Sequence, residues 1–209
     1  MSQFFTIYPA NINLRLIRQA VSALRDGGVV VYPTDSCYAL GCHLDDKNAV
    51  TKIRQIRQLD EQHHFTLMCR DLSEISRYAR VDNHQFRLLK ANTPGSYTFI
   101  LEASKEVPKR LQHPKRSTIG IRIPDHPVAL ALLEELNEPM MSSTLILPDQ
   151  QWPPTDAGEI RGLLEKQVAV VIDGGAVALE FTTVIDLSGD TPVLVRQGRG
   201  SITPFGIET

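Results

Sequence analysis

Short clusters of hydroxyl, carboxylate and guanidinium groups recur in this sequence beside apolar runs. The densest cluster, Tyr32-Pro33-Thr34-Asp35-Ser36, directly follows the apolar run 29–32. Proline stops a strand ladder, so these hydroxyls and the carboxylate should lie at the strand's end. Five further clusters follow, at residues 93–98, 118–126, 141–144, 182–186 and 193–200. Hydroxyls, arginines and amides at strand ends are groups that hold anions, so we expect an anionic small molecule or nucleic acid as ligand.

The main clusters also allow a structural interpretation. Thr, Asp and Ser are favoured in turns, so residues 34–36 could form a capping turn and nothing more. Arg122 lies inside an apolar strand pattern, where a guanidinium is costly unless it is paired. It therefore binds either an internal carboxylate or an anionic ligand. Cys37 either contacts the ligand or packs in the core.

Several common sites are absent from the sequence. There is no Gly-x-x-x-x-Gly-Lys phosphate loop, no Gly-x-Gly-x-x-Gly, no Gly-x-Ser-x-Gly elbow and no His-Glu-x-x-His. Any phosphate binding must therefore use scattered side chains and backbone amides at strand ends.

Hydrophobic periodicity predicts the elements that position these clusters. Strands are expected at residues 4–8, 29–32, 65–69, 97–101, 118–123, 140–144, 168–172, 183–187 and 193–196, and helices at 14–24, 46–57, 72–91 (one broken helix or two) and 127–136. Residues 147–157, rich in Pro and Asp, are expected to form a mobile loop or lid. The order predicts a single α/β domain over 1–209, with a twisted, mixed, open sheet and helices on both sides.

Composition and charge indicate where the protein is expected to act and what kind of partner it binds. No apolar run approaches the roughly 18 residues of a membrane span, and we see no signal peptide at the N-terminus. The three cysteines fit no zinc or redox spacing, so we expect reduced thiols in a soluble, cytoplasmic protein. Residues 43–122 hold 15 Lys and Arg against 9 Asp and Glu, whereas residues 123–195 hold 2 against 12. This separation favours an anionic partner for the first region, although a solvated mixed-charge surface explains it equally well.

As a set, the clusters resemble the YrdC-like family of L-threonylcarbamoyladenylate synthases, which act in tRNA modification, and most closely its YciO branch. The resemblance rests on Tyr-Pro-Thr-Asp after a strand, Pro-Gly-x-x-Thr, Gly-x-Arg-x-Pro-Asp, and Thr-Val-x-Asp followed by Arg-x-Gly. It covers roughly residues 10–200. It implies formation of threonylcarbamoyl-AMP from L-threonine, bicarbonate and ATP, with Mg²⁺ accompanying the ATP and no protein nucleophile.

The resemblance also implies roles for individual residues. Thr34, Arg57 and Arg122 would bind substrate: Thr34 would lie against the threonine, Arg122 near the shared carboxylate or phosphate, and Arg57 stands where the family's Lys-x-Arg element has lysine. Ser143, Thr182 and Arg196 would bind the nucleotide. No metal-ligating side chains are implied.

Three positions depart from the family's motifs. Leu59 stands where the family's Lys-x-Arg element has arginine, Ser96 where Pro-Gly-Pro has its second proline, and Ile146 where Thr-Ser-Ala-Asn has asparagine. Lys52 or Arg54 could replace the lost cation, and His63 or His64 could add a contact. Each is otherwise a surface residue.

Two other functions remain open at this stage. One is a related enzyme that acts on another amino acid. The other is a non-catalytic protein that binds tRNA or double-stranded RNA through a basic concave surface, with affinity that falls steeply with salt. The candidate RNA-binding residues are Lys52, Arg54, Arg110, Lys115 and Arg116.

Overall fold

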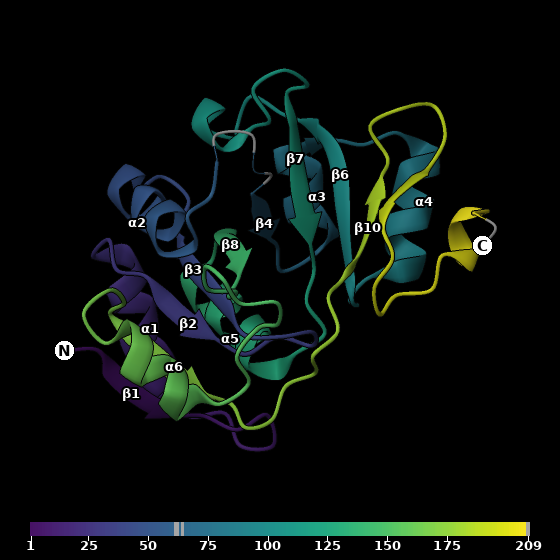
Figure 1. Cartoon of the computed structure of the whole chain (residues 1–209). Coiled ribbons are helices and arrows are strands. Elements are labelled where there is room, and N and C mark those ends of the chain that lie inside the picture. Colours follow the sequence, from purple (N-terminus) through teal and green to yellow (C-terminus); the bar gives the residue numbers. More distant parts are fainter. Residues whose placement is uncertain (61–62, 64, 208–209) are drawn as a thin grey trace.

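The computed structural model describes residues 1–60, 63 and 65–207. Within these residues one eleven-stranded sheet runs through the molecule in the order β1-β9-β2-β3-β8-β4-β7-β6-β10-β11, and β5 pairs with β6 outside this path. Both parallel and antiparallel pairs occur along it, so the sheet is mixed and open (Figure 1). The strands are β1 (Gln3–Thr6), β2 (Val30–Tyr32), β3 (Ala39–His43), β4 (Thr66–Met68), β5 (Ala79–Arg80), β6 (Tyr97–Ala103), β7 (Thr118–Arg122), β8 (Met140–Thr144), β9 (Val170–Asp173), β10 (Thr183–Asp186) and β11 (Val193–Arg196).

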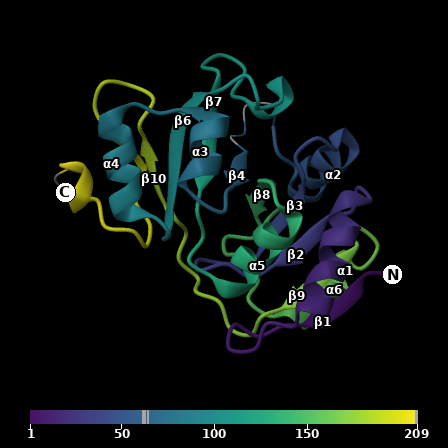
Figure 2. The same cartoon turned by 180° about the vertical axis from the view of Figure 1, so that it is seen from behind.

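Helices cover both faces of this sheet, as the sequence predicts. They are α1 (Leu14–Arg25), α2 (Lys47–Arg57), α3 (Leu72–Tyr78), α4 (Asn83–Asn92), α5 (Pro127–Leu136) and α6 (Ala157–Leu164), with the 3₁₀ turns η1 (Lys109–Leu111) and η2 (Thr203–Phe205). Buried side chains of α1 and α5 share one hydrophobic core, and those of α2, α3, α4 and α6 share another. Seen from behind, α3 lies in front of the sheet near β6 and β7, and α4 lies beside β10 (Figure 2).

Strand alternation separates the two cores. In β8, Met140 packs with α1 and α5, whereas Met141 packs in the other core. Successive strand residues point to opposite faces, so each strand of the central sheet contributes to both layers. This explains why the strands read as continuous apolar runs rather than alternating ones.

Side chains at the helix starts fix where each helix begins. Asn13 accepts from the backbone N–H groups of residues 15 and 16 at the start of α1, and Asp46 accepts from Ala49 at the start of α2. Asp82 and Gln85 form a reciprocal capping box before α4. The last turn of α2 carries Arg57, whose side chain reaches Ser143 near the end of β8.

Most predicted elements are present, and the differences are informative. Residues 72–91 form two helices, the second of the two predicted possibilities, and the short strand β5 between them was not predicted. Strand β3 and helix α6 were not predicted. Residues 147–156 form no helix or strand, and α6 begins at Ala157, capped by the Asp156 side chain. No helix in the described part of the chain is long and apolar enough to cross a membrane.

Candidate active site

A cavity of about 500 Å³ lies on a part of the sheet that α1 and α5 leave uncovered. In β6, Thr98 and Ile100 line it, whereas the alternating Phe99 and Leu101 point into the core on the opposite face. A smaller adjoining space of about 30 Å³ reaches the turn after β2. Both spaces are lined by Thr66, Thr98, Ser142, Ser143, Thr144 and Thr182. The wall that they share is therefore made almost wholly of hydroxyl side chains.

The turn between β2 and β3 is built around Thr34. Its hydroxyl donates to the carbonyl of Cys37 at 2.7 Å, and its oxygen accepts from the backbone N–H groups of Ser36 and Cys37. The structural interpretation of this cluster is thus correct for the Thr34 side chain. The same residue also lines the smaller space, with Ser36 and Cys37, so the turn and the candidate site are one structure.

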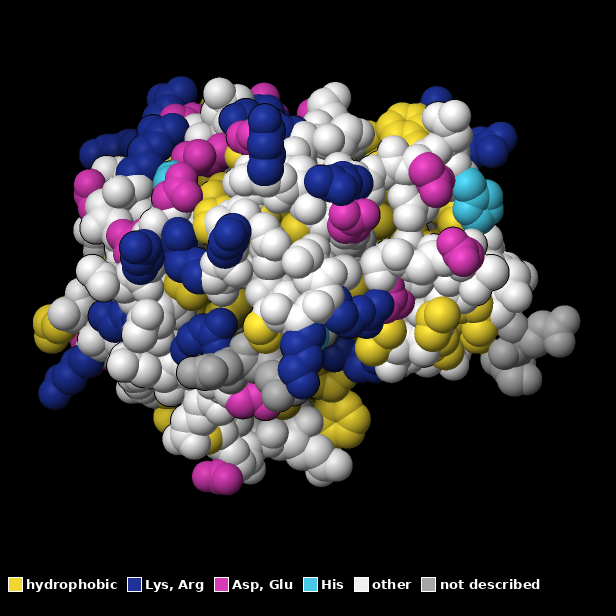
Figure 3. Space-filling view, turned by 90° about the horizontal axis from the view of Figure 1, so that it is seen from above, with side chains coloured by type: hydrophobic (Ala, Val, Ile, Leu, Met, Phe, Trp, Pro, Cys, Tyr) yellow, Lys and Arg dark blue, Asp and Glu magenta, His cyan; other side chains and the backbone are white. Residues whose placement is uncertain are grey.

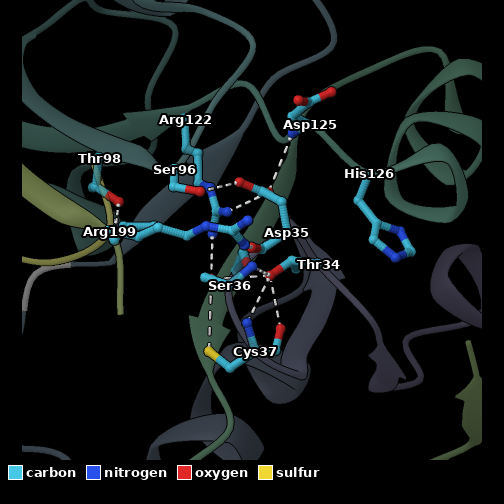
Figure 4. Close-up of polar contacts among 12 residues, drawn as sticks. Thr34, Asp35, Ser36, Cys37, Ser96, Thr98, Arg122, Asp125, His126 and Arg199 are labelled. Atoms are coloured by element: carbon cyan, nitrogen blue, oxygen red, sulfur yellow. Dashed lines mark hydrogen bonds and ion pairs between the residues drawn. The ribbon is translucent and has the colours of Figure 1, made fainter. Parts of the chain in front are cut away.

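Arg122 forms a buried ion pair with Asp35, so its partner is an internal carboxylate (Figure 4). Only 6% of Arg122 is exposed, and it also donates to the Ser36 hydroxyl at 3.2 Å. Its Nε is buried and has no hydrogen-bond partner within residues 1–60, 63 and 65–207. A guanidinium that lines a cavity with an unused donor is suited to hold a further anionic or carbonyl oxygen.

Three segments far apart in sequence meet at Asp35. Its Oδ2 accepts from the Ser96 hydroxyl at 2.7 Å, and its Oδ1 accepts from the backbone N–H of Asp125 at 3.2 Å. Arg199 donates to the Asp35 carbonyl at 2.5 Å. Asp35, Ser96 and Arg199 each lie in a cluster identified in the sequence, but none was assigned a site role, because sequence gives no signal for pairing over such separations.

Arg57 reaches the cavity from the last turn of α2. It donates to Ser143 Oγ at 2.5 Å and to the carbonyl of Ile146 at 3.4 Å. Burial, together with the charge of Arg196, lowers the pKa of Arg57 to about 10, against an opposing effect of Cys37. Its guanidinium therefore lies in a half-buried setting near a second positive charge.

Arg196, the last residue of β11, lines the cavity next to Thr182. It donates to the Thr182 carbonyl at 3.0 and 3.2 Å and to its hydroxyl at 3.2 Å. Burial lowers the pKa of Arg196, and Arg122 lowers it further, while Cys37 opposes them. In the described part of the molecule neither Arg57 nor Arg196 forms an ion pair with a carboxylate. Two guanidinium groups thus share one cavity and donate to neutral oxygens, and the cavity lining also includes Asp60. Two cations against one carboxylate favour an anionic ligand.

The structure brings all six predicted site residues to this pair of spaces. Arg57, Ser143, Thr182 and Arg196 line the larger one, and Thr34, Arg122, Ser143 and Thr182 line the smaller one. Their roles toward a ligand stay predictions. The arrangement contains hydroxyls, guanidinium groups and turn amides, so it can bind and orient an anion.

The three departures have distinct structural outcomes. Leu59 packs against the hydrophobic core, Ser96 hydrogen-bonds Asp35, and Ile146 lines the larger cavity as an apolar wall. Of the proposed substitutes, Lys52 is exposed, and Arg54 lies over the Phe65 ring at 4.6 Å. His63 lines the cavity, whereas His64 lies outside the described residues.

The candidate RNA-binding residues are only partly available. Figure 3 shows Lys and Arg side chains gathered on one face, with Asp and Glu among them. Arg116 pairs with Asp186 at 2.6 Å, and Arg110 donates to the Leu44 carbonyl at 2.8 Å. Lys52 and Lys115 are exposed. RNA binding stays a prediction, because this geometry gives it no specific support.

Asp60 is the acidic side chain that lines the larger cavity in the described part of the chain. Within the described ranges, no group of three His, Cys, Asp or Glu side chains could hold a metal ion. The three cysteines are buried free thiols, as expected, and burial raises the pKa of Cys37. A magnesium ion here would need ligands from a bound phosphate.

Comparison with known proteins shows that the chain has a known fold. Residues 22–198 match the Sua5/YciO/YrdC family model, described as telomere recombination. The chain is 59% identical to YciO of Escherichia coli K12, over 98% of this chain and all of that protein, and the YciO crystal structure matches with a TM-score of 0.95. The Bacillus subtilis 168 threonylcarbamoyl-AMP synthase is 30% identical, over 87% of this chain and 53% of that protein. The structure of P. abyssi Sua5 with L-threonine matches with a TM-score of 0.87 at 27% identity, over 94% of this chain and 58% of that one.

Proposed function

The chain belongs to the Sua5/YciO/YrdC family, and from this premise we propose that it forms threonylcarbamoyl-AMP from L-threonine, bicarbonate and ATP. The family includes threonylcarbamoyl-AMP synthases, and one relative has been crystallised with L-threonine. These relatives support the reaction class. The resemblance seen in the sequence motifs is confirmed at the level of the family.

One observation carries the proposal. Arg57 and Arg196 enter a single half-buried cavity from opposite sides, and each donates only to neutral oxygens among the residues described. Like charges in a medium of reduced dielectric repel one another more strongly than in water. A triphosphate would relieve this repulsion and satisfy the hydroxyls of Ser143 and Thr182 as well.

The proposed chemistry needs positioning rather than a protein nucleophile. The threonine amine and bicarbonate form a carbamate with loss of water. A carbamate oxygen then attacks the α-phosphorus of ATP, and the bond to pyrophosphate breaks. The chain's contribution is to hold two anions within reach and to neutralise charge that develops on the phosphoryl oxygens.

We assign the two ligands to the two spaces. The nucleotide phosphates lie between Arg57 and Arg196, and the amino acid lies toward Thr34 and Arg122. The Arg122 side chain lines the smaller space, so its positive charge would attract a carboxylate or carbamate there. Magnesium would supply charge neutralisation on the phosphates when bound.

The test is release of pyrophosphate from Mg-ATP and bicarbonate, with and without L-threonine. We expect threonine-dependent release, reduced about ten- to hundredfold by Arg57→Ala or Arg196→Ala, because a hydrogen bond to a charged group contributes roughly 1.5–3 kcal/mol. Arg87→Ala is the matched control, since Arg87 is exposed on α4, away from the cavity.

Other outcomes separate the alternatives. Release with a different amino acid would keep the mechanism and change the substrate, as Leu59 and Ile146 allow. Absence of release with every amino acid, from a folded protein, would refute the proposal and return attention to RNA binding. Equal loss in all three variants would show that the arginines act through folding rather than through the ligand.

A further inference from the structure

Two aromatic rings stack at the rim of the cavity. Phe181 lines the cavity, and its ring lies nearly parallel to that of Trp152, with the ring centroids 6.4 Å apart and the planes 14° apart. Trp152 belongs to the segment 147–156, which forms no helix or strand, and 57% of it is exposed. Most of this large ring is thus left to solvent while its partner ring faces the candidate site.

The same aromatic pair is joined to the anion-binding groups. The guanidinium of Arg196 lies 5.0 Å from the centroid of the Phe181 ring. A cation over an aromatic face stabilises the ring's orientation and remains available for hydrogen bonds in its own plane. One side chain, Arg196, therefore links an aromatic surface with the proposed phosphate position.

The lining of the cavity combines polar and apolar side chains. Ser143, Thr182 and the two arginines are polar, whereas Ile146 and Phe181 are apolar. A ligand that contacts both kinds of side chain carries anionic groups and an apolar, planar group. A nucleoside triphosphate has this chemistry.

We propose that the Trp152–Phe181 pair binds the base of the nucleotide, which stacks on these rings while its phosphates lie between Arg57 and Arg196. This inference rests on the proposed function and adds the residues that hold the base. Stacking on aromatic side chains tolerates different bases, because every base has a π-face. The pair should therefore contribute affinity for purines in general rather than choose adenine by hydrogen bonding.

The experiment compares ligands with and without a base. Affinities of the full chain for ATP and for inorganic tripolyphosphate are measured by calorimetry, for the wild type and for Trp152→Ala, Trp152→Phe and Phe181→Ala. We expect Trp152→Ala and Phe181→Ala to weaken ATP binding about five- to hundredfold, and tripolyphosphate binding to stay within twofold. Trp152→Phe, which keeps an aromatic face, should retain most of the affinity for ATP. Phe86→Ala, at an exposed phenylalanine on α4, is the control.

A second readout comes from the sequence itself. Trp152 is the only tryptophan of the chain, so its fluorescence reports on this position alone. ATP should change the emission saturably, and tripolyphosphate at saturation should change it much less.

The outcomes distinguish the inference from its premise. If Trp152→Ala binds ATP as the wild type does, or loses ATP and tripolyphosphate equally, the stacking role is refuted while the phosphate site stands. If the wild type binds neither ligand, the proposed function fails and the stacking role fails with it. Base-dependent loss in Trp152→Ala and Phe181→Ala, with retention in Trp152→Phe, supports the inference.

Discussion

Replacement of Asp35 by alanine should destabilise the protein strongly, because this carboxylate is the only ionic partner of Arg122 among the residues described. The side chains of both residues are less than a tenth exposed. Asp35→Ala removes the carboxylate from the Ser96 hydroxyl and from the backbone N–H of Asp125 as well. It leaves a buried guanidinium without a counter-charge.

The magnitude follows from what is left behind. Removal of one partner of a buried ion pair costs about 3–5 kcal/mol, because the remaining charge stays desolvated and uncompensated. For a domain of 150–250 residues, each kcal/mol lowers the melting temperature by roughly 2–4 °C. Asp35→Ala should therefore melt about 6–20 °C below the wild type. Most of the lost stability comes from leaving Arg122 buried without a counter-charge. The destabilisation by Asp35→Ala should therefore depend on the presence of Arg122.

Thermal and urea unfolding, followed by circular dichroism at pH 7, measure this dependence in a double-mutant cycle. With Arg122→Met, the double variant Asp35→Ala/Arg122→Met should be more stable than Asp35→Ala alone, with a coupling of about 2 kcal/mol or more. Asp125→Ala is the control, since its exposed side chain lies outside the network while its backbone N–H is kept; it should change stability by at most about 0.5 kcal/mol. Additive effects, or a shift below about 2 °C in Asp35→Ala, would refute the reasoning.

Two further predictions concern Asp186, at the end of β10, and Gly198, which follows β11. Burial acts to raise the pKa of Asp186, but hydrogen bonds from Ser188 and Arg116 outweigh it and hold the pKa below the ordinary value. The folded state therefore binds this proton less readily than the unfolded chain does, so the stability is complete above about pH 4 and is lost as the pH falls through the folded pKa. Ser188→Ala should lower the free energy of unfolding at pH 7 by roughly 1.5–3 kcal/mol and by less near pH 2, as acid titration of urea unfolding would show; an equal effect at both pH values would contradict it. At Gly198 a Cβ would approach the carbonyl oxygen of Phe181 to 2.2 Å, so Gly198→Ala should cost about 1–3 kcal/mol in the same assay, and an unchanged midpoint would show that β11 can shift.

The strands at 140–144 and 193–196 could be predicted with the bounds that the structure shows, because each is a short apolar or hydroxyl-rich run between clear breaks. Strand β3 could not. It consists of Ala39-Leu40-Gly41-Cys42-His43, in which Ala and Gly are poor strand formers. Its conformation is imposed by β2 on one side and β8 on the other. Pairing with distant strands leaves no mark on the local sequence.

The candidate site shows the same difference between local features, which the sequence predicts, and long-range contacts, which it does not. Hydroxyls and arginines at strand ends identify the lining residues, because residue type and strand position are local properties. The partner of Arg122 could only be narrowed to a carboxylate or a ligand, since Asp35 lies 87 residues away. The Trp152–Phe181 pair could not be predicted for a related reason. A loop without periodicity gives no indication of which side chain its tryptophan will meet.

The contact of Arg199 with the Asp35 carbonyl joins residues 164 positions apart. A chain emerging from the ribosome carries the turn around Thr34 early but receives Thr182, Arg196 and Arg199 only near the end of synthesis. Closure of such long loops makes folding slow, so the cavity is assembled late and all at once. A chain truncated before Thr182 would therefore lack Thr182 and Arg196, two of the side chains that line the cavity, and could not form the candidate site.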